Sequence, residues 1–293
     1  MAVILITGAK GQLGNELKVA TKKIFGHDYI FTDIDTLDIT DGEKTQEFVK
    51  TIKPDWIINC AAYNAVDKAE TEFEKALMIN GIAVKNIVSV IRDSPCRLIH
   101  ISSDYVFDGK SSVPYRESAP TNPVSVYGRS KLEGEKYALL HPLSMVIRTS
   151  WLYSSFGSNF VKTIIRLSGE KEIIKVVNDQ TGTPTYAADL AHAIIQIIMG
   201  VNNNQIAFNG GIYHYSNEGF CTWYDFACAI KEEAGFKTPV EPIKTKDFPT
   251  AAARPKYSVL SKVKIAENYR IGIPHWRTSL SKCIHLIKKN KSK

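Results

Sequence analysis

A glycine-rich turn near the N-terminus constrains the fold of this chain more than any other feature. Gly8, Gly11 and Gly14 follow the apolar, β-branched run at positions 3–7 and open a segment with helical spacing. The run is typical of a strand buried on both faces. Glycines allow a tight turn and a close approach of the backbone to a pyrophosphate, which the N-terminus of the following helix then attracts. The pattern predicts a dinucleotide-binding turn, although its spacing differs by one residue from the GxGxxG fingerprint.

Strands and helices are expected to alternate from the N-terminus to residue 150. Apolar runs typical of strands lie at positions 3–7, 29–33, 56–61, 97–102 and 145–149. Segments with helical spacing lie between them, at positions 12–23, 43–52, 68–92 and 130–140. Such alternation predicts βαβ units. We therefore expect an α/β fold, a Rossmann-type doubly wound parallel sheet with helices on both faces.

The regularity weakens after residue 150, where prolines punctuate the chain. Helices are still expected at positions 159–167, 187–199 and 223–234, the last introduced by Thr222 as a cap. We therefore expect residues 1–150 to form the dinucleotide-binding domain and residues 151–293 mainly a smaller, mixed α/β substrate-binding region. Segments near 178–200 are expected to return to the first domain.

The net charge of the chain limits the classes of partner that we expect it to bind. The formal net charge is +7, and four of these charges come from a C-terminal lysine tail, Lys288, Lys289, Lys291 and Lys293. We expect this tail to be frayed and solvated. No nucleic-acid-binding motif accompanies it, so no nucleic-acid partner is expected. The mildly basic remainder favours an anionic substrate such as a nucleotide sugar.

The number and spacing of the cysteines indicate in which cellular compartment the protein is expected. They are odd in number, form no CxxC pair and stand at positions 60, 96, 221, 228 and 283. Neither a disulfide framework nor a zinc site is expected, so a reducing cytoplasm fits best. We recognise no signal peptide and no apolar run long enough to span a bilayer, and expect no membrane association.

A second constellation lies in VYGRSKLEGE, where Tyr127 and Lys131 are four residues apart. Residues i and i+4 share a helix face, so both side chains are expected to point into one cleft. A nearby ammonium lowers the pKa of a phenol, which makes Tyr127 a general acid towards a forming alkoxide. Ser103, in ISSDYVFDG, offers a hydroxyl that polarises the same carbonyl oxygen. Together with the glycine turn, these residues predict hydride transfer to or from a carbonyl carbon.

The choice of nicotinamide cofactor stays open. Asp33 ends the second expected strand, at the distance from Gly14 where a carboxylate accepts hydrogen bonds from the adenosine ribose. A carboxylate there repels a 2′-phosphate and favours NADH. Lys10, in the glycine turn, would instead attract that phosphate and favour NADPH.

Nine segments taken together resemble the nucleotide-sugar reductases of the extended short-chain dehydrogenase/reductase family. The resemblance implies NADPH- or NADH-dependent reduction of the C4 ketone of dTDP-4-dehydro-β-L-rhamnose to dTDP-β-L-rhamnose, a reaction of dTDP-rhamnose biosynthesis. The resemblance also suggests a homodimer with Mg²⁺ bound at the contact between the subunits. We recognise no Mg²⁺ site in the sequence. The segments are GAKGQLG, LDITD, NCAAYNAVDKAE, SSDYVFDG, YGRSKLEGE, RTSWLY, NF, DQTGTPT and ARP, between residues 8 and 255.

The resemblance assigns roles to matching positions. The implied catalytic residues are Ser103, Tyr127 and Lys131, the last also holding the ribose of the nicotinamide. With the glycines and Asp33, the implied cofactor-binding residues are Gln12, Leu13, Asp38, Ile39, Ala62, Tyr63 and Asn64. The implied substrate-binding residues, besides Ser103, are Asp104, Trp151 and Arg254.

Two departures from the family pattern and two alternative functions need stating. Ser103 and Asn64 stand where the family usually has threonine. We expect activity to survive the serine, which keeps the hydroxyl, and we expect Asn64, which remains polar, to bond the cofactor. A sugar-nucleotide epimerase or dehydratase on the same scaffold is one alternative, although the dehydratase Asp-Glu pair is lacking, since Asp104 is followed by Tyr105. A non-catalytic subunit resembling the regulatory β subunit of methionine adenosyltransferase is the other.

Overall fold

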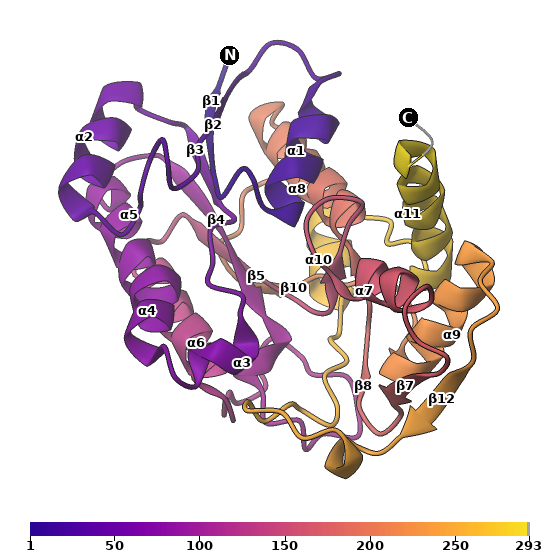
Figure 1. The fold of residues 1–293 in the computed structure, drawn as a ribbon. Coiled ribbons are helices and arrows are strands. Elements are labelled where there is room, and N and C mark those ends of the chain that lie inside the picture. The colour runs from indigo at the N-terminus through magenta and orange to yellow at the C-terminus, as the bar shows by residue number, and fades with distance from the viewer. Residues whose placement is uncertain (292–293) are drawn as a thin grey trace.

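A six-stranded, wholly parallel sheet forms the centre of the molecule (Figure 1). The computed structural model describes residues 1–291. The strand order is β10-β5-β4-β3-β1-β2, and neighbouring strands pair in parallel throughout. The predicted Rossmann-type α/β fold is confirmed. The strands are β1 Val3–Thr7, β2 Asp28–Phe31, β3 Trp56–Asn59, β4 Arg97–Ser103, β5 Ser144–Thr149 and β10 Gly211–His214.

Helices cover both faces of the sheet because successive apolar strand residues point to opposite sides. Ile4 and Ile6 pack towards α1 (Gln12–Thr21) and α8 (Ala187–Asn202). Leu5, between them, packs on the other face. That face is covered by α2 (Gly42–Ile52), α5 (Ala83–Ile91) and α6 (Val126–Ala138).

The segment between β3 and β4 is broken into short pieces rather than the one or two helices expected at 68–92. It comprises α3 Val66–Ala69, α4 Phe73–Leu77, the π-helical turn η1 Met78–Ile82 and then α5. π-helical turns are rare and occur often at functional sites. Here the turn carries the buried Asn80, whose amide binds the backbone of Tyr63 and the hydroxyl of Ser130 on α6. The turn thus ties the loop after β3 to the helix of the Tyr-Lys pair.

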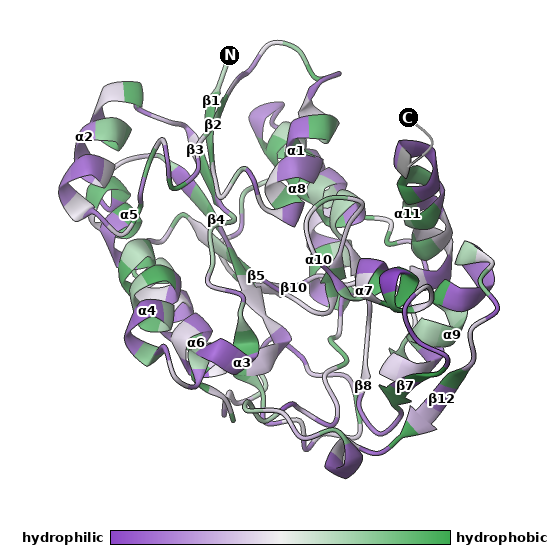
Figure 2. Ribbon diagram, in the orientation of Figure 1, coloured by the Kyte–Doolittle hydropathy of each residue, from purple (hydrophilic) through white to green (hydrophobic). Residues whose placement is uncertain are grey.

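The second half of the chain forms a smaller aromatic core beside the sheet. Tyr153, Phe226 and Trp276 lie in that core, between α7 (Phe160–Leu167), α9 (Trp223–Ala234) and α11 (Trp276–Lys291). In Figure 2, α11 carries apolar and polar colours along its length, as expected for an amphipathic helix. The remaining elements are β6 Leu152–Tyr153, β7 Ile174–Val177, β8 Thr181–Gly182, β9 Thr185–Tyr186, β11 Cys221–Thr222, β12 Val240–Ile243 and α10 Val263–Tyr269, with the 3-10 turns η2 Asp104–Val106 and η3 Thr245–Asp247.

Three features differ from the sequence-based expectation. The sixth strand, β10, was not expected, and neither were α10 and α11. The expected frayed tail is wrong as far as the structure describes it, because α11 continues to Lys291 and the Lys288 ammonium donates a hydrogen bond to the Glu233 carbonyl. Lys293 lies outside the described residues. Within residues 1–291, no helix has both the length and the apolar character that a membrane span requires.

Candidate active site

Two adjoining clefts open at the carboxyl ends of the parallel strands. The first cleft, of about 480 Å³, lies between the glycine turn, the loop after β2 and the loop after β3. The second cleft, of about 490 Å³, lies between the glycine turn, the end of β4, α6 and residues of the second half of the chain. Both clefts are lined by Gly11, Cys60, Ala62 and Asn64. The chain reverses its direction of winding between β1 and β3, where open α/β sheets bind their ligands.

The glycine turn fits a pyrophosphate. Gly8 has a φ of +66°, and a Cβ there would lie 2.6 Å from the Ala61 backbone nitrogen. A Cβ on Gly14 would overlap the carbonyl oxygen of Gly8. Gly11 is the N-cap of α1 and, within the described residues, no side chain caps this helix. The first N–H groups of α1 are therefore available to an anion at the wall shared by the two clefts.

Asp33 lines the first cleft but lies two residues beyond the end of β2. One carboxylate oxygen accepts a hydrogen bond from the Lys10 backbone N–H at 2.7 Å, and the other accepts from the Ile34 N–H at 2.9 Å. The Lys10 ammonium pairs with Asp35 at 2.8 Å rather than with Asp33. Asp33 therefore also holds the glycine turn in place.

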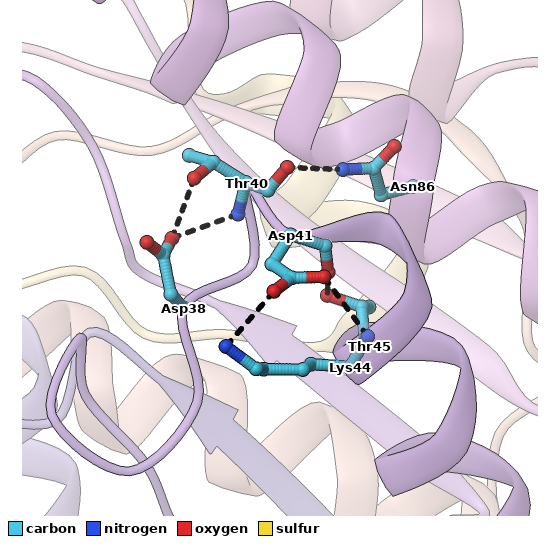
Figure 3. A network of polar contacts seen from close by, with 6 residues as sticks. All are labelled: Asp38, Thr40, Asp41, Lys44, Thr45 and Asn86. Atoms are coloured by element: carbon cyan, nitrogen blue, oxygen red, sulfur yellow. Dashed lines mark hydrogen bonds and ion pairs between the residues drawn. The ribbon is translucent and has the colours of Figure 1, made fainter.

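The loop that carries Asp38 and Ile39 is fixed by a polar network (Figure 3). Asp38 accepts hydrogen bonds from the backbone N–H and the hydroxyl of Thr40, at 2.9 and 2.7 Å. The Asn86 amide reaches from α5 and donates to the carbonyl oxygens of Ile39 and Thr40, both at 3.1 Å. Asp41 caps α2 directly afterwards. Asp38 and Ile39 therefore form a pre-ordered wall of the first cleft, which suits an adenine ring.

Tyr63 behaves differently from its predicted neighbours Ala62 and Asn64. Those two residues line both clefts, but Tyr63 is not among the described residues that line either of them. Its hydroxyl donates to Glu72 at 3.0 Å, and its ring packs in a small apolar cluster with Val126. The structure thus gives Tyr63 a packing role beside the start of α6, and a direct cofactor contact remains a prediction.

The three predicted catalytic side chains meet in the second cleft. Ser103, Tyr127 and Lys131 all line it. The helix α6 begins at Val126, four residues earlier than expected, because Ser125 caps it by accepting from the Gly128 N–H at 3.1 Å. Tyr127 and Lys131 therefore lie one above the other on its buried face, as the spacing predicts.

The electrostatics of the trio differ from the expectation. Burial raises the pKa of Tyr127 to about 12, and a contact with the Ser103 hydroxyl opposes this only in part. Burial lowers the pKa of Lys131 to about 8, and its ammonium donates to the Ile101 carbonyl at 2.6 Å. The expected lowering of the phenol pKa by Lys131 is therefore wrong in this arrangement, because desolvation of the phenolate dominates. Both groups are protonated at neutral pH, as a proton donor and its cationic partner must be.

Asp104 and Trp151 also line the second cleft. Asp104 accepts a hydrogen bond from the Ser103 hydroxyl at 3.0 Å. Burial raises the pKa of its carboxyl to about 6, against the opposing effect of the Ser258 and Ser103 hydroxyls. Trp151 has a φ of +46°, which is uncommon for a residue with a side chain.

The indole of Trp151 is held by two residues that the sequence did not single out. Trp223 stacks on it with ring centroids 3.5 Å apart and planes at 7°. A Cβ on Gly182 would lie 2.5 Å from the indole, so the position requires a glycine. Trp223 also lines the second cleft. No local pattern marks Trp223 as a cleft residue, because it resembles any aromatic residue at the start of an amphipathic helix.

The guanidinium of Arg254 is hydrogen-bonded to other groups of the protein and is therefore not free to bind a diphosphate. Its guanidinium forms two hydrogen bonds with Asp67, at 2.7 and 3.1 Å, and a third with the Ala252 carbonyl at 3.2 Å. It is not among the described residues that line either cleft. A diphosphate at Arg254 would compete with Asp67 for the same planar fork.

The second half of the chain also contacts the glycine turn. The amide of Asn159, at the N-terminus of α7, donates to the Gln12 side-chain oxygen at 3.0 Å. Gln12, Leu13 and Asn159 line the second cleft together with Gly157. Within residues 1–291, no group of three or more acidic, histidine or cysteine side chains is arranged to hold a metal ion.

The two clefts together suit an extended dinucleotide with a polar substrate at one end. Ordered loop residues form the wall of the first cleft, an uncapped helix N-terminus lies between the clefts, and a buried phenol and ammonium lie in the second. Such a set can orient a carbonyl compound and deliver a proton to its oxygen.

Comparison with known proteins supports this interpretation. Residues 1–289 match the family described as RmlD substrate binding domain. The Bacillus subtilis spore coat polysaccharide biosynthesis protein SpsK is 41% identical, over 96% of both chains. The structure of a Clostridium acetobutylicum dTDP-4-dehydrorhamnose reductase is 41% identical with a TM-score of 0.91, over 98% of this chain and 99% of that one. The structure of the Bacillus anthracis dTDP-4-dehydrorhamnose reductase, in complex with NADP, is 39% identical with a TM-score of 0.90, over 97% and 99%. The resemblance inferred from the nine segments is confirmed, and the chain belongs to the RmlD family, together with the dTDP-4-dehydrorhamnose reductases to which it is similar.

Proposed function

We propose that this protein reduces the C4 ketone of dTDP-4-dehydro-β-L-rhamnose to dTDP-β-L-rhamnose, with NADPH or NADH as reductant. One observation carries the proposal. Ser103, Tyr127 and Lys131 line a cleft that is continuous with the cleft of the glycine turn. Relatives of 41% and 39% identity that are named dTDP-4-dehydrorhamnose reductases supply the sugar.

The chemistry divides between the cofactor and the chain. Bound reduced nicotinamide supplies the hydride that a carbonyl carbon accepts. Tyr127 donates its proton to the oxygen of that carbonyl, so that the ketone gains one hydride and one proton and becomes an alcohol. The Lys131 ammonium offsets part of the cost of burying the phenolate that remains, because the two side chains share one buried helix face, although burial still keeps the net pKa of Tyr127 high. Ser103 orients the same oxygen by hydrogen bonding.

We propose that the sugar nucleotide is bound from the other side of the second cleft. Asp104 contacts a sugar hydroxyl, and the fixed indole of Trp151 packs against the sugar nucleotide. Arg254 reaches the diphosphate once Asp67 releases it. The glycine turn, Gln12 and Leu13 hold the cofactor pyrophosphate, and Asp33, Asp38 and Ile39 hold its adenosine. We propose that both NADH and NADPH are accepted. The Asp33 carboxylate, which would repel a 2′-phosphate, binds backbone N–H groups, and the Lys10 ammonium, which would attract it, is paired with Asp35.

We further propose residues 1–150 as the cofactor-binding domain and residues 151–293 as mainly the substrate-binding region. The packing of α8 on α1 supports the return of residues near 178–200 to the first domain. A cytoplasmic location is supported by the five free cysteines within residues 1–291. A homodimer is proposed from family resemblance alone, and sedimentation of the purified protein tests it.

A coupled assay tests the reaction. dTDP-4-dehydro-L-rhamnose is generated in place, the protein is added with NADPH or NADH, and loss of the reduced nicotinamide absorbance is followed. Tyr127→Phe should reduce turnover by at least about 100-fold, the lower range for a lost general acid, while dinucleotide affinity changes less than about twofold. Tyr137→Phe is the matched control, since Tyr137 lies on the same helix outside both clefts.

Two outcomes would redirect the proposal. Near-normal turnover by Tyr127→Phe would remove Tyr127 as the acid while leaving the reaction intact. No oxidation by a folded wild-type protein that binds dinucleotide would favour the alternatives. Tightly bound cofactor with isomerised sugar would then indicate an epimerase, and co-purification with a synthetase would indicate a regulatory subunit.

A further inference from the structure

A buried ion pair lies next to the catalytic trio and has no part in the proposed chemistry. The Glu135 carboxylate accepts from two nitrogens of Arg148, Nε at 2.8 Å and Nη2 at 2.7 Å. Both side chains are only 2% exposed. Burying an ion pair costs desolvation energy that the attraction often does not recover, so a well-packed apolar pair would serve stability equally well. The location of the pair is therefore a better guide to its role than its contribution to the free energy of unfolding.

The same carboxylate has a third hydrogen bond. The Ser102 hydroxyl donates to Glu135 Oε1 at 2.5 Å. Ser102 lies on β4 directly before Ser103, and Arg148 lies on β5 directly before Thr149, which lines the second cleft. A single carboxylate on α6 thus binds the ends of two neighbouring strands just below the residues that face the substrate.

The position of Glu135 on α6 continues the catalytic face. Tyr127, Lys131 and Glu135 are spaced four residues apart, so they follow one another along one side of the helix. Arg148 is itself restrained, since its guanidinium lies 5.0 Å from the Phe107 ring centroid and 3.5 Å from His214 Nε2. The carboxylate is therefore held rigidly and can transmit that rigidity to the helix.

We propose that Glu135 is a positioning residue for the reduction, which fixes α6 against β4 and β5 so that Tyr127 and Lys131 face Ser103. The inference rests on the proposed function for its kinetic test. Glu135 is not among the described residues that line either cleft, so the geometry assigns it no direct contact with substrate or cofactor.

The groups around Lys131 determine the direction of the electrostatic effect. Burial lowers the pKa of Lys131 to about 8, and the Glu135 carboxylate, followed by Cys60, opposes this. His100 and the Ile101 carbonyl face the ammonium from β4, and Tyr127 lies one turn away on α6. The Arg148 cation is balanced by Glu135. Neutralising Glu135 would remove an anion and leave a cation nearby, so the pKa of Lys131 would fall further and less of it would be charged at neutral pH.

The experiment compares two variants with two matched controls. Glu135→Gln keeps the shape and removes the charge, and Ser102→Ala removes only the hydrogen bond to β4. The controls are Glu170→Gln, which breaks the exposed Arg166–Glu170 pair, and Ser144→Ala, a buried serine at the other end of β5. Turnover and KM are measured from pH 6 to 9, the urea midpoint is measured for each variant, and the Lys131 titration is followed by NMR of ¹³C-lysine-labelled protein.

Glu135→Gln should lower kcat by at least about tenfold at pH 7.5, with KM changed less than about threefold. It should also move the alkaline limb of the pH–kcat profile, and the midpoint of the Lys131 titration seen by NMR, about one pH unit lower. Ser102→Ala should lower kcat severalfold without moving the limb. Both controls should match wild type. The proposal is overturned if folded Glu135→Gln keeps the wild-type kcat and Lys131 midpoint, or if Ser102→Ala is as harmless as Ser144→Ala. Because the NMR midpoint needs no turnover, a wild-type protein without reductase activity would reject the proposed function while still testing the effect of Glu135 on Lys131.

Discussion

The proposed cofactor half and the proposed substrate half of the cleft system are built in different ways. The cofactor half uses backbone features of neighbouring segments, namely the positive φ of Gly8, the uncapped start of α1 and the bonded loop around Asp38. The substrate half uses side chains brought together from distant segments, such as Trp151 stacked on Trp223 and Arg254 paired with Asp67. A backbone cradle recognises a ligand that many proteins share, whereas a side-chain wall can be changed to suit one sugar.

The proposed catalytic trio, Ser103, Tyr127 and Lys131, lies where the halves meet. Ser103 ends a strand of the sheet, and Tyr127 and Lys131 lie on a helix of the cofactor half. Their cleft is closed on the other side by Trp151, Trp223 and the 157–159 loop. The comparison therefore predicts that a substitution in one half leaves the other half able to bind its own ligand. Catalysis, in contrast, requires both halves to be intact.

The largest effect is expected from Gly8→Ala, which tests whether the cofactor half depends on backbone geometry. The new Cβ would lie 2.6 Å from the Ala61 backbone in a residue with φ of +66°, so the turn must shift. Dinucleotide affinity should fall by at least about 100-fold, since the phosphates lose correctly placed N–H groups. NADPH fluorescence titration measures the affinity. Gly26→Ala is the control, because Gly26 also has a positive φ, of +83°, but no atom within 4 Å among the described residues. Equal binding by the two variants would contradict the claim.

A smaller effect, confined to the substrate half, is expected from Gly182→Ala. A methyl group there would lie 2.5 Å from the Trp151 indole and push it off Trp223. KM for the dTDP-sugar should rise about 30-fold, because a misplacement of about 1 Å can cost up to 100-fold, with dinucleotide affinity unchanged. Steady-state kinetics gives the KM, and the far-ultraviolet circular dichroism of the stacked indoles reports their separation. Gly272→Ala, at an exposed position without close neighbours among residues 1–291, should match wild type. A preserved indole signal together with normal KM would show that the stack does not shape the substrate half.

Asp104, at the junction of the halves, is expected to alter the free energy of unfolding in a pH-dependent way. Because burial raises the pKa of its carboxyl to about 6, the folded state binds an extra proton between about pH 4 and 6, and Asp104 destabilises the fold as pH rises through that window. Asp104→Asn should therefore be more stable than wild type above pH 6, by about 3 kcal/mol, and equal to it below pH 4. Urea unfolding at pH 4, 5, 6 and 7 measures the difference. A constant difference at all four values would mean that the carboxyl does not titrate in this window.

Local patterns predicted individual elements in both halves of the chain. The bounds of β1 agree with the expected run at positions 3–7, and α9 agrees with the expected helix and its Thr222 cap. These elements depend on contacts within a few residues, which hydrophobic periodicity and caps encode directly. The strand β10 has four residues and no strong periodicity, and it becomes a strand only because β5 lies beside it.

The sequence by itself determined the strand–turn–helix of the glycine turn, the shared helix face of Tyr127 and Lys131, and the family. Each follows from spacing along a short stretch of chain, which fixes geometry without reference to distant residues. Only the tertiary structure decided that Trp223 supports Trp151, that Asp67 occupies Arg254, and that the pKa of the Tyr127 phenol rises rather than falls. Stacking, pairing and desolvation depend on which distant side chains exclude water from one another, and no spacing along the chain specifies that.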